Sequence, residues 1–487
     1  MSVKKIIPGP AVWPIIGTNW TFYPIIGKGY DQDRLHEVFL SKFREYGPVI
    51  KEVHKKQAIV SIYNPEDIFK VLYSSQKDPT RLSHYALLHF RRSRPDLFAS
   101  GGLVPSQGEE WHRLRMNFQP PLMASQLKKT FGTFEKISEE FVEYLGELSQ
   151  KSIDGTVPNI VYSLHDWALE NICSLVFDSR LDNFSTKRKK ICYDMVEAGE
   201  TLLSALKIVE VTTNWKYYET KAYRQMATTE LYFYNFAKTY VEKTRKAIGD
   251  GLIKNPAEHS LIAYYLSSPN MDVRDIITTA SDLLVAGHLT TAYATAFVLY
   301  TLGINETKQE ILYNQLCKDI PDVNDPVKAE DMSSTKKYIY LRACYKEALR
   351  LNAVTLGTGR VLSTDMVLGN YLVEKGTVIL TQNQVASTLD EYVDNAKEFK
   401  PERWLKSSYP NKMLPQSLPW LVLPFGFGTR VCLGKNISPL QTQILIAKII
   451  RRYRVVSISP KKLRLKTILI NVPDEPINIQ FIPRENV

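Results

Sequence analysis

The chain has 487 residues, of which 44% are hydrophobic and 23% are charged, an ordinary globular composition that excludes a mainly disordered, collagen-like or coiled-coil protein. Lys and Arg number 62 against 51 Asp and Glu, which gives a formal net charge of +11. This modest excess suits an acidic protein partner or an anionic membrane surface at least as well as nucleic acid. The five widely spread cysteines argue against a disulfide framework and favour a reducing compartment.

The first 30 residues are rich in Pro and Gly, which predicts an irregular segment without a readable targeting signal or membrane anchor. Residues 49–63 are β-branched and alternate in polarity, which predicts a β-hairpin. Asn64 and Pro65 follow it and predict the start of a helix, with Asn64 as the N-cap and Pro65 at the first helical position.

Helical periodicity then dominates to about residue 350 and returns at residues 435–453. Between them, residues 361–380 predict β-structure, and residues 389–434 predict a long irregular stretch. The sequence shows no internal repeat and no low-complexity linker. The expected fold is mostly α with small β-sheets, in a single domain over residues 1–487.

Residues 283–304 contain no Asp, Glu, Lys or Arg and would span about 33 Å as a helix, long enough to cross a membrane. Gly287, His288, Thr290, Thr291 and Thr295 lie inside this stretch, and no second stretch resembles it. A buried central helix of a large domain is the favoured interpretation.

The strongest local pattern is the Gly-rich segment 423–434, which precedes an apolar helix and contains Cys432. A thiolate near neutral pH needs backbone N–H donors, a helix N-terminus or a metal, and this segment can offer all three. Glycines permit close approach of the backbone to a flat ligand, Phe425 can shield the sulfur, and Arg430 can pair with a carboxylate on that ligand. A buried cysteine in a Gly-rich turn is the alternative that the loop alone leaves open.

Phe425, Gly428, Arg430, Cys432 and Gly434 resemble, position for position, the haem-ligand loop of the cytochrome P450 family. The resemblance covers residues 7 to 480 and implies the P450 fold. It also implies haem b as the cofactor, with Cys432 as the axial thiolate ligand of the iron, and O₂ as a co-substrate. Gly428, Gly434 and Phe425 would shape the loop around the cofactor.

A second segment resembles the family in Glu347 and Arg350, at i and i+3 of a predicted helix, with Arg403 of Pro401-Glu-Arg-Trp404 as a third member. Alone, such a pair is usually a solvated helix ion pair. The resemblance implies a buried structural triad that fixes the cysteine-bearing stretch through bidentate arginine geometry.

Further matches concern residues that would bind the haem carboxylates and residues that would lie next to bound O₂. By resemblance, Trp111 and Arg115, at i and i+4, hold one propionate, and Arg360 with Arg430 adds two more cations. In residues 286–291, Gly287 would let haem and oxygen approach the central helix beside Ala286. Thr290 would bond to the Ala286 carbonyl and help to deliver protons.

The sequence departs from the family at Leu289, where an Asp or Glu usually precedes the Thr. The usual proton relay is therefore in doubt, and slower or poorly coupled turnover is expected. His288 points about 200° around the helix from Thr290 and is a poor substitute. After the cysteine, Pro439 is expected to shift or bend the following helix.

The chain has no flavin or nicotinamide motif, so a separate electron donor is expected. Arg342 and Lys346, at i and i+4, resemble the basic positions by which mitochondrial-type members dock an acidic ferredoxin, and Lys435 could extend the patch. Two solubilising charges are the alternative reading of that pair. Segments 33–36, 80–84, 101–105 and 359–365 resemble arthropod mitochondrial members, in particular steroid hydroxylases of moulting-hormone synthesis.

The resemblance implies a sterol-like substrate in an apolar pocket, with candidates at 85–90, 283–284, 288, 354–356 and 468–470. A fatty acid or hydrophobic xenobiotic would suit the same residues. Three functions stay open: a ferredoxin-dependent monooxygenase, a haem–thiolate isomerase or peroxygenase that needs no reductase, and a non-catalytic ligand-binding member.

The expected location is the mitochondrial inner membrane, with the endoplasmic reticulum as the alternative. Residues 181–223, with the basic cluster 187–190, are expected to contact the membrane, and no nucleic-acid role is expected.

Overall fold

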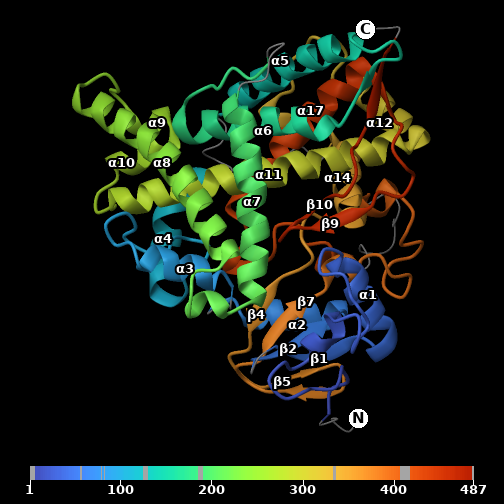
Figure 1. Ribbon diagram of the computed structural model, residues 1–487. Coiled ribbons are helices and arrows are strands. Elements are labelled where there is room, and N and C mark those ends of the chain that lie inside the picture. Colours follow the sequence, from blue (N-terminus) through green and yellow to red (C-terminus); the bar gives the residue numbers. More distant parts are fainter. Residues whose placement is uncertain are drawn as a thin grey trace. The chain divides into compact units, whose positions relative to one another are not determined.

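The computed structural model describes residues 6–54, 57–77, 79–81, 83–123, 130–184, 190–332, 336–405 and 417–484. It is mostly α-helical with small β-sheets, as the sequence predicts (Figure 1). Contacts along the chain divide it into two compact units, each built from three separate segments. Unit 1 comprises Met1–Leu82, Lys346–Cys432 and Arg464–Asp474, and unit 2 comprises Ser83–Tyr345, Leu433–Leu463 and Glu475–Val487.

Unit 1 is built on the predicted hairpin. Strands β1 (Val49–His54) and β2 (Gln57–Ile62) are antiparallel, β7 (Val378–Thr381) lies parallel to β2, and β4 (Gly359–Val361) closes the sheet in the order β1-β2-β7-β4. Two small antiparallel pairs complete the strands of this unit: β5 (Met366–Leu368) with β6 (Tyr371–Val373), and β9 (Leu465–Thr467) with β10 (Asn471–Pro473). The parallel β2–β7 pair joins segments more than 300 residues apart, so local sequence could predict the strands but not this partnership.

The helices of unit 1 are short. Asn64 caps α2 as predicted, because its Oδ1 accepts a hydrogen bond of 2.8 Å from the Glu66 amide, and Pro65 occupies the first turn. The core of the unit packs β1, β2 and β7 against α2. The helical elements wholly within this unit are η1 (Asn19–Phe22), α1 (Leu35–Tyr46), α2 (Pro65–Ser74), α15 (Asn383–Ala386), η5 (Pro401–Trp404), α16 (Leu418–Leu421) and η7 (Gly428–Arg430). Helix α14 (Ile339–Leu351) contains the division between the units.

Unit 2 carries the long helices, with α11 (Val273–Gly303) packed against α6, α7, α8 and α17. Its helical elements are α3 (Tyr85–Arg92), α4 (Gly108–Phe118), η2 (Pro120–Leu122), α5 (Phe131–Gln150), α6 (Ile160–Phe177), α7 (Lys190–Val211), η4 (Asn214–Lys216), α8 (Lys221–Gly249), α9 (Pro256–His259), α10 (Leu261–Ser267), α11, α12 (Glu306–Asp319), α13 (Ala329–Met332), η8 (Leu433–Asn436) and α17 (Ser438–Arg452). A three-stranded sheet in the order β3-β11-β8 joins Thr156–Val157, Ile479–Pro483 and Tyr453–Ser457.

Helix α11 is long and apolar enough to cross a membrane, the only such helix among the described residues. However, 72% of its most apolar stretch is buried inside the protein. It is therefore the core helix of unit 2, which confirms the favoured interpretation of residues 283–304.

Helix α17 begins later than the sequence pattern suggests. Residues Leu433–Asn436 form the separate 3₁₀ turn η8, and α17 then starts at Ser438 with Pro439 in its first turn. Proline is tolerated there because the first amides of a helix have no partner within it, so Pro439 shifts the helix start without breaking it.

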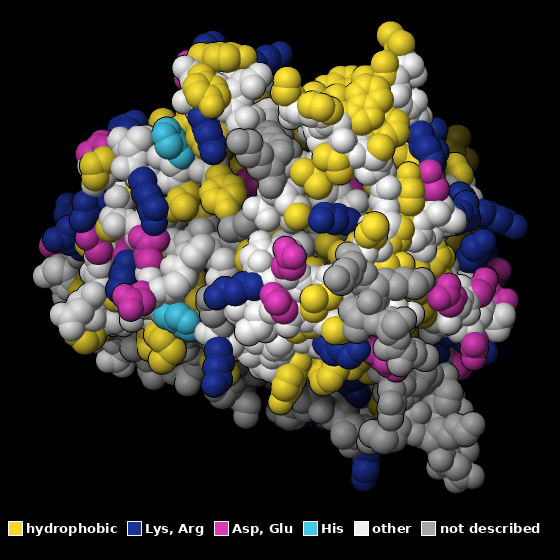
Figure 2. Space-filling model, turned by 90° about the horizontal axis from the view of Figure 1, so that it is seen from below, with side chains coloured by type: hydrophobic (Ala, Val, Ile, Leu, Met, Phe, Trp, Pro, Cys, Tyr) yellow, Lys and Arg dark blue, Asp and Glu magenta, His cyan; other side chains and the backbone are white. Residues whose placement is uncertain are grey.

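The surface mixes charges of both signs with exposed apolar side chains. Figure 2 shows Lys and Arg scattered among Asp, Glu and hydrophobic side chains on one face. On this face the basic side chains are therefore interspersed with acidic ones rather than gathered into one patch.

Candidate haem–thiolate site

The cysteine loop in unit 1 is closed by backbone hydrogen bonds. The Cys432 amide donates to the Phe425 carbonyl at 2.9 Å, and the Val431 amide donates to Gly428 at 3.1 Å. Gly426 and Gly428 have φ values of +72° and +79°, a region that side chains rarely tolerate, so these two positions require glycine. The loop holds the Cys432 side chain at an exposed position, whereas Cys173, Cys192 and Cys344 are buried.

Three arginines gather at this loop. Arg360 is only 2% exposed, and it donates to the carbonyls of Gly359 (2.8 Å) and Phe427 (3.3 Å). Its Nε is buried without a hydrogen-bond partner in the described part of the chain. Burial, and then the like charge of Arg81, lower the pKa of Arg360 to about 9. Arg430 is buried as well, and its Nη1 lies 3.4 Å from the Pro79 carbonyl.

Sequence reasoning missed Arg81. Its Nη2 donates to the Arg430 carbonyl at 2.9 Å, and burial lowers its pKa while the nearby Cys432 partly opposes that change. The motif at residues 80–84 was interpreted only as a marker of the family branch. A loop arginine has no periodicity, so only the fold could bring Arg81 to the cysteine loop.

These residues fit a haem. An exposed thiol on a tight Gly-rich loop offers an iron ligand, and the loop is open beside Gly426, where an added Cβ would come no nearer than 3.8 Å to its nearest neighbour, Thr358 Oγ1. The buried Arg360, with an unbonded Nε and a lowered pKa, is a cation that an acidic side chain of the cofactor would stabilise. Cys432 would hold the iron, and Arg360 with Arg430 would face the carboxylates.

The structure brings the predicted triad together in unit 1. Glu347 accepts from Arg350 Nε (3.0 Å) and Nη2 (2.8 Å) and from Arg403 Nε (2.7 Å). The exposures of the three residues are 0%, 1% and 5%. Trp404 Nε1 and the Lys400 amide also donate to Glu347, at 2.8 and 3.1 Å, so this carboxylate is surrounded by five donors.

Arg350 also connects the triad to the backbone of the irregular stretch. It donates to the carbonyls of Ser387, Ala396 and Glu398 at 2.6 to 3.0 Å. Charge-assisted bonds of this kind are about twice as strong as neutral ones, so the triad pins a segment that lacks regular secondary structure.

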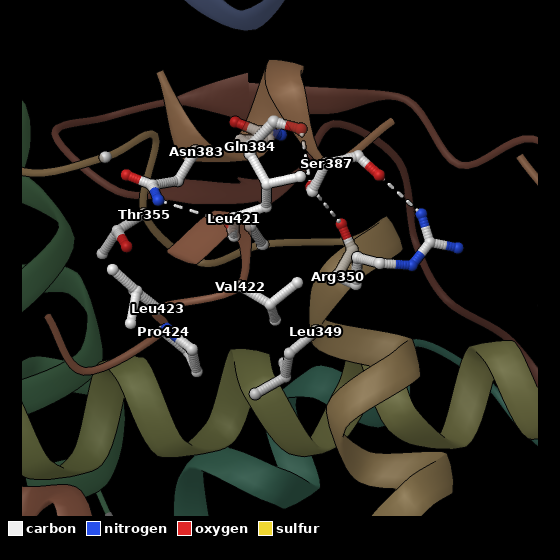
Figure 3. Close-up of a pocket in the computed structure, with 12 residues that line it drawn as sticks. Leu349, Arg350, Thr355, Asn383, Gln384, Ser387, Leu421, Val422, Leu423 and Pro424 are labelled. Carbon is white, nitrogen blue, oxygen red and sulfur yellow. Dashed lines mark hydrogen bonds between the residues drawn. The ribbon is translucent and has the colours of Figure 1, made fainter. Parts of the chain in front are cut away.

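A small pocket adjoins the triad (Figure 3). Figure 3 shows that it lies among Leu349 and Arg350 of α14, the side chains of Asn383, Gln384 and Ser387, and residues 421–424, which lead into the cysteine loop. Asn383 Nδ2 donates to the Trp420 carbonyl at 2.8 Å, and its buried Oδ1 has no partner in the described chain. The cavity volume of about 20 Å³ has room for about one water molecule, so this pocket is too small for a sterol.

Residues 286–291, which are predicted to lie next to bound O₂, belong to α11 in unit 2. Thr290 Oγ1 donates to the Ala286 carbonyl at 2.7 Å, as the sequence predicts. Ala286 is exposed and Thr290 is half-buried, whereas Leu284, His288 and Leu289 are buried. Ala286 and Thr290 are four residues apart, so the helix presents them on one accessible stripe.

The structure corrects the role expected of Gly287. A Cβ built on this residue would lie 2.6 Å from Ile172 Cδ1, so the missing side chain admits the packing of α6 rather than an approach from the open stripe. Ala286, the neighbouring small residue, is the exposed member of the motif.

His288 and Leu289 face neighbouring helices. His288 Nδ1 lies 2.8 Å from the Leu284 carbonyl, and its ring contacts those of His165 and Phe233. Burial lowers the pKa of His288 to about 4, so it is a neutral packing residue near pH 7. This placement agrees with the expectation that His288 is a poor proton donor to Thr290.

The remaining predicted residues are divided between the units. Trp111 (3% exposed) and Arg115, whose Nε donates to Gln119 Oε1 at 2.6 Å, lie on α4 in unit 2. Arg342 and Lys346 lie one turn apart on α14, and Lys435 is exposed on η8. Gly434 belongs to η8 in unit 2.

Comparison with known proteins identifies the family of this chain. The family model for cytochrome P450 matches residues 7–481. The chain is 33% identical to cytochrome P450 302a1, mitochondrial, of Drosophila melanogaster, over 98% of this chain and 95% of that protein. It is 28% identical to the ecdysone 20-monooxygenase of Drosophila melanogaster, over 98% and 88%, respectively. It is 26% identical to the 1,25-dihydroxyvitamin D(3) 24-hydroxylase, mitochondrial, of Rattus norvegicus, over 98% and 89%. The chain therefore belongs to the cytochrome P450 family, and it is a P450 monooxygenase.

Proposed function

We propose that this monooxygenase hydroxylates a steroid-like substrate, an ecdysteroid precursor, with O₂ and with electrons from a ferredoxin. Its sequence resembles the arthropod ecdysteroid 22-hydroxylases, and related proteins include an ecdysone and a vitamin D hydroxylase by name. The observation that carries the chemistry is the exposed Cys432 thiol on a loop whose Phe427 carbonyl accepts a hydrogen bond from the buried Arg360. Haem bound there would supply oxygen activation, which thiolate ligation favours.

The residues of this chain have defined parts in that proposal. By the family resemblance, Cys432 would hold the iron, and Arg360, Arg430, Trp111 and Arg115 would bind the carboxylates of the haem. Thr290 keeps its hydroxyl hydrogen-bonded to the Ala286 carbonyl on the accessible stripe of α11, where a proton can be held close to a bound substrate.

The electron donor is proposed to bind at α14. Lys346 is exposed, and its Nζ lies 5.5 Å from the centre of the Trp404 ring. Arg342 is half-buried and donates to the Met332 carbonyl at 3.1 Å; burial lowers its pKa while Asp319 partly opposes that change. Cations held at fixed positions suit an acidic protein, because electrostatic complementarity raises the association rate.

The proposed location is the mitochondrial inner membrane, since several relatives carry "mitochondrial" in their names. Exposed apolar side chains at Ile208, Val211, Tyr217 and Tyr218 support a peripheral contact from the end of α7 and η4. The basic residues 187–189 of the expected contact lie outside the described residues.

The test is turnover of ecdysteroid precursors by the haem-loaded protein with ferredoxin and its reductase, with the product identified by mass. A hydroxylated product that requires the ferredoxin, and that is lost in the double variant Arg342→Glu/Lys346→Glu, is the expected result. The matched control is Lys51→Glu/Lys397→Glu, which makes the same charge change at exposed positions and should keep activity.

Other outcomes point elsewhere. A product that forms without the reductase system would support an isomerase or peroxygenase. A substrate-induced spectral shift without any product would support a ligand-binding role.

A further inference from the structure

Cys317 is the second accessible thiol of this chain. It lies on α12 and is half-buried, while Cys173, Cys192 and Cys344 are buried and Cys432 is assigned to the iron. All five cysteines lie within the described residues. Cys317 takes no part in the haem site, and its surroundings belong entirely to unit 2.

The guanidinium of Arg451, from the end of α17, lies against this thiol. Arg451 Nη1 is 3.1 Å from Cys317 Sγ, and Nη2 donates to the Pro321 carbonyl at 3.1 Å. Arg451 is only 5% exposed, and its Nε is buried without a partner in the described chain.

A second guanidinium lies beside the first. Arg484 stacks on the ring of Tyr313, one turn before Cys317, with Cζ 3.6 Å from the ring centre. The Cζ of Arg451 lies 5.8 Å from the centre of the same ring. Arg484 Nη1 is 3.0 Å from Glu310 Oε2, but its Nε and Nη2 are buried and unbonded within the described residues.

Glu310 therefore pairs with Arg484 and not with Arg451 among the described contacts, and three guanidinium nitrogen atoms next to a thiol have no hydrogen-bond partner within the described residues. A buried donor without an acceptor costs free energy, and the cost is larger for a charged group. Carboxylates are the acceptors that arginine binds best, often through two parallel bonds. The cluster is thus suited to an anionic molecule that also reacts with sulfur.

We propose that Cys317 forms a mixed disulfide with a small acidic thiol of the glutathione class, whose carboxylates bind Arg451 and Arg484. In this step the Cys317 thiolate attacks one sulfur of the oxidised, disulfide-linked dimer of that thiol. A new S–S bond forms as the old S–S bond breaks, and one acidic thiolate leaves with the electron pair and takes a proton from water. The thiolate is the attacking species, and Arg451 balances its charge.

This site is independent of the proposed hydroxylation, and its test needs no turnover. The haem-loaded protein is treated separately with oxidised glutathione (anionic), hydroxyethyl disulfide (neutral) and cystamine (cationic) at equal concentration. Intact mass and peptide mapping give the rate of modification at each cysteine. The expected result is modification at Cys317, with the anionic reagent about tenfold faster than the cationic one, a ratio typical of one charge-assisted bond.

Matched variants separate recognition from simple exposure. Arg451→Gln and Arg484→Gln should each reduce the preference for the anionic reagent, whereas Glu310→Gln should increase it by releasing Arg484. Cys317→Ser should abolish the labelling and Cys344→Ser should leave it unchanged, with the haem absorbance reporting that each variant is folded.

Equal rates with the three reagents, or unchanged preference in both arginine variants, would overturn the proposal and leave Arg451 as a helix-packing residue. Labelling at a cysteine other than Cys317 would overturn it as well. Because Arg451 is buried, Arg484→Gln decides the question if Arg451→Gln does not fold.

Discussion

Leu289 of α11 fills the space that Gly199 leaves on α7. A Cβ built on Gly199 would lie 2.8 Å from Leu289 Cδ1 and 3.4 Å from His288 Cε1, and Leu289 is fully buried. The position at which the family usually carries an acid is therefore a helix-packing position in this chain. The small residue on α7 and the leucine on α11 form a complementary pair.

Gly199→Ala should lower the free energy of unfolding by about 1–3 kcal/mol, because the added methyl group overlaps Leu289. Leu289→Ala should cost about 2–5 kcal/mol alone, but the two changes together should cost at least about 0.5 kcal/mol less than their sum. Denaturant unfolding of the four proteins measures this coupling.

The control for this pair is Gly132→Ala on α5, where an added Cβ meets nothing within 4 Å. That change should be neutral or stabilising by about 0.5–1 kcal/mol, since alanine favours the helix. Strict additivity of Gly199→Ala and Leu289→Ala would contradict the packing account.

Glu347→Gln should be strongly destabilising. The change leaves two buried arginines without their shared carboxylate, and breaking such a buried pair costs about 3–5 kcal/mol. The variant should also lose haem, because the triad fixes the stretch that leads to the cysteine loop. Thermal unfolding and the haem absorbance measure the two effects.

Glu398→Gln is the matched control, since its side chain is exposed and only its backbone carbonyl binds Arg350. It should change stability by less than about 0.5 kcal/mol. If both variants lost equal stability, the triad would not be the source of the effect.

His288 should make the protein sensitive to acid. Burial lowers its folded-state pKa from 6.5 to about 4, so between these pH values the unfolded chain binds a proton that the folded protein does not. Stability from this residue is complete above pH 6.5 and is lost as the pH falls toward 4, by about 3 kcal/mol in all.

His288→Leu should remove this part of the acid sensitivity. The loss of unfolding free energy between pH 7 and pH 4.5 should be smaller in the variant than in the wild type, whereas the exposed control His259→Gln should behave as wild type. Parallel pH curves for wild type and His288→Leu would refute the assignment.

The parts predicted from sequence are those governed by local rules. The hairpin, the Asn64 cap and the i, i+3 pair of Glu347 and Arg350 depend on residues that are close in the chain. Arg403, 56 residues from Glu347, came only from the family resemblance. The polar residues within 283–304 predict that this stretch is a buried central helix and not a membrane span.

The parts that sequence could not give depend on which distant surfaces meet. Gly287 faces Ile172 of α6, and nothing in the local pattern distinguishes that contact from an open groove. Arg81 donates to the carbonyl of Arg430, which is nearly 350 residues away in the chain. Trp404 donates a hydrogen bond to Glu347, although it is not one of the three residues of the predicted triad. Such contacts depend on long-range packing, so periodicity does not predict them.

Arg360→Gln should weaken haem retention by roughly 10- to 100-fold, the range expected for losing one charge-assisted bond. Arg360→Lys should retain part of the affinity because it keeps the charge but not the forked geometry. The dissociation rate of haem to an acceptor protein measures the loss. The exposed control Lys51→Gln should match the wild type.

A proton measurement distinguishes an electrostatic role of Arg360 from a packing role. With a pKa of about 9 in the haem-free protein, Arg360 is mostly neutral at pH 10 and charged at pH 7. A bound carboxylate raises that pKa, so haem binding at pH 10 should take up close to one proton through this residue, and little at pH 7. Calorimetry in buffers of different ionisation enthalpy counts the protons. Uptake at pH 10 that persists in Arg360→Gln would show that another group meets the cofactor's carboxylates.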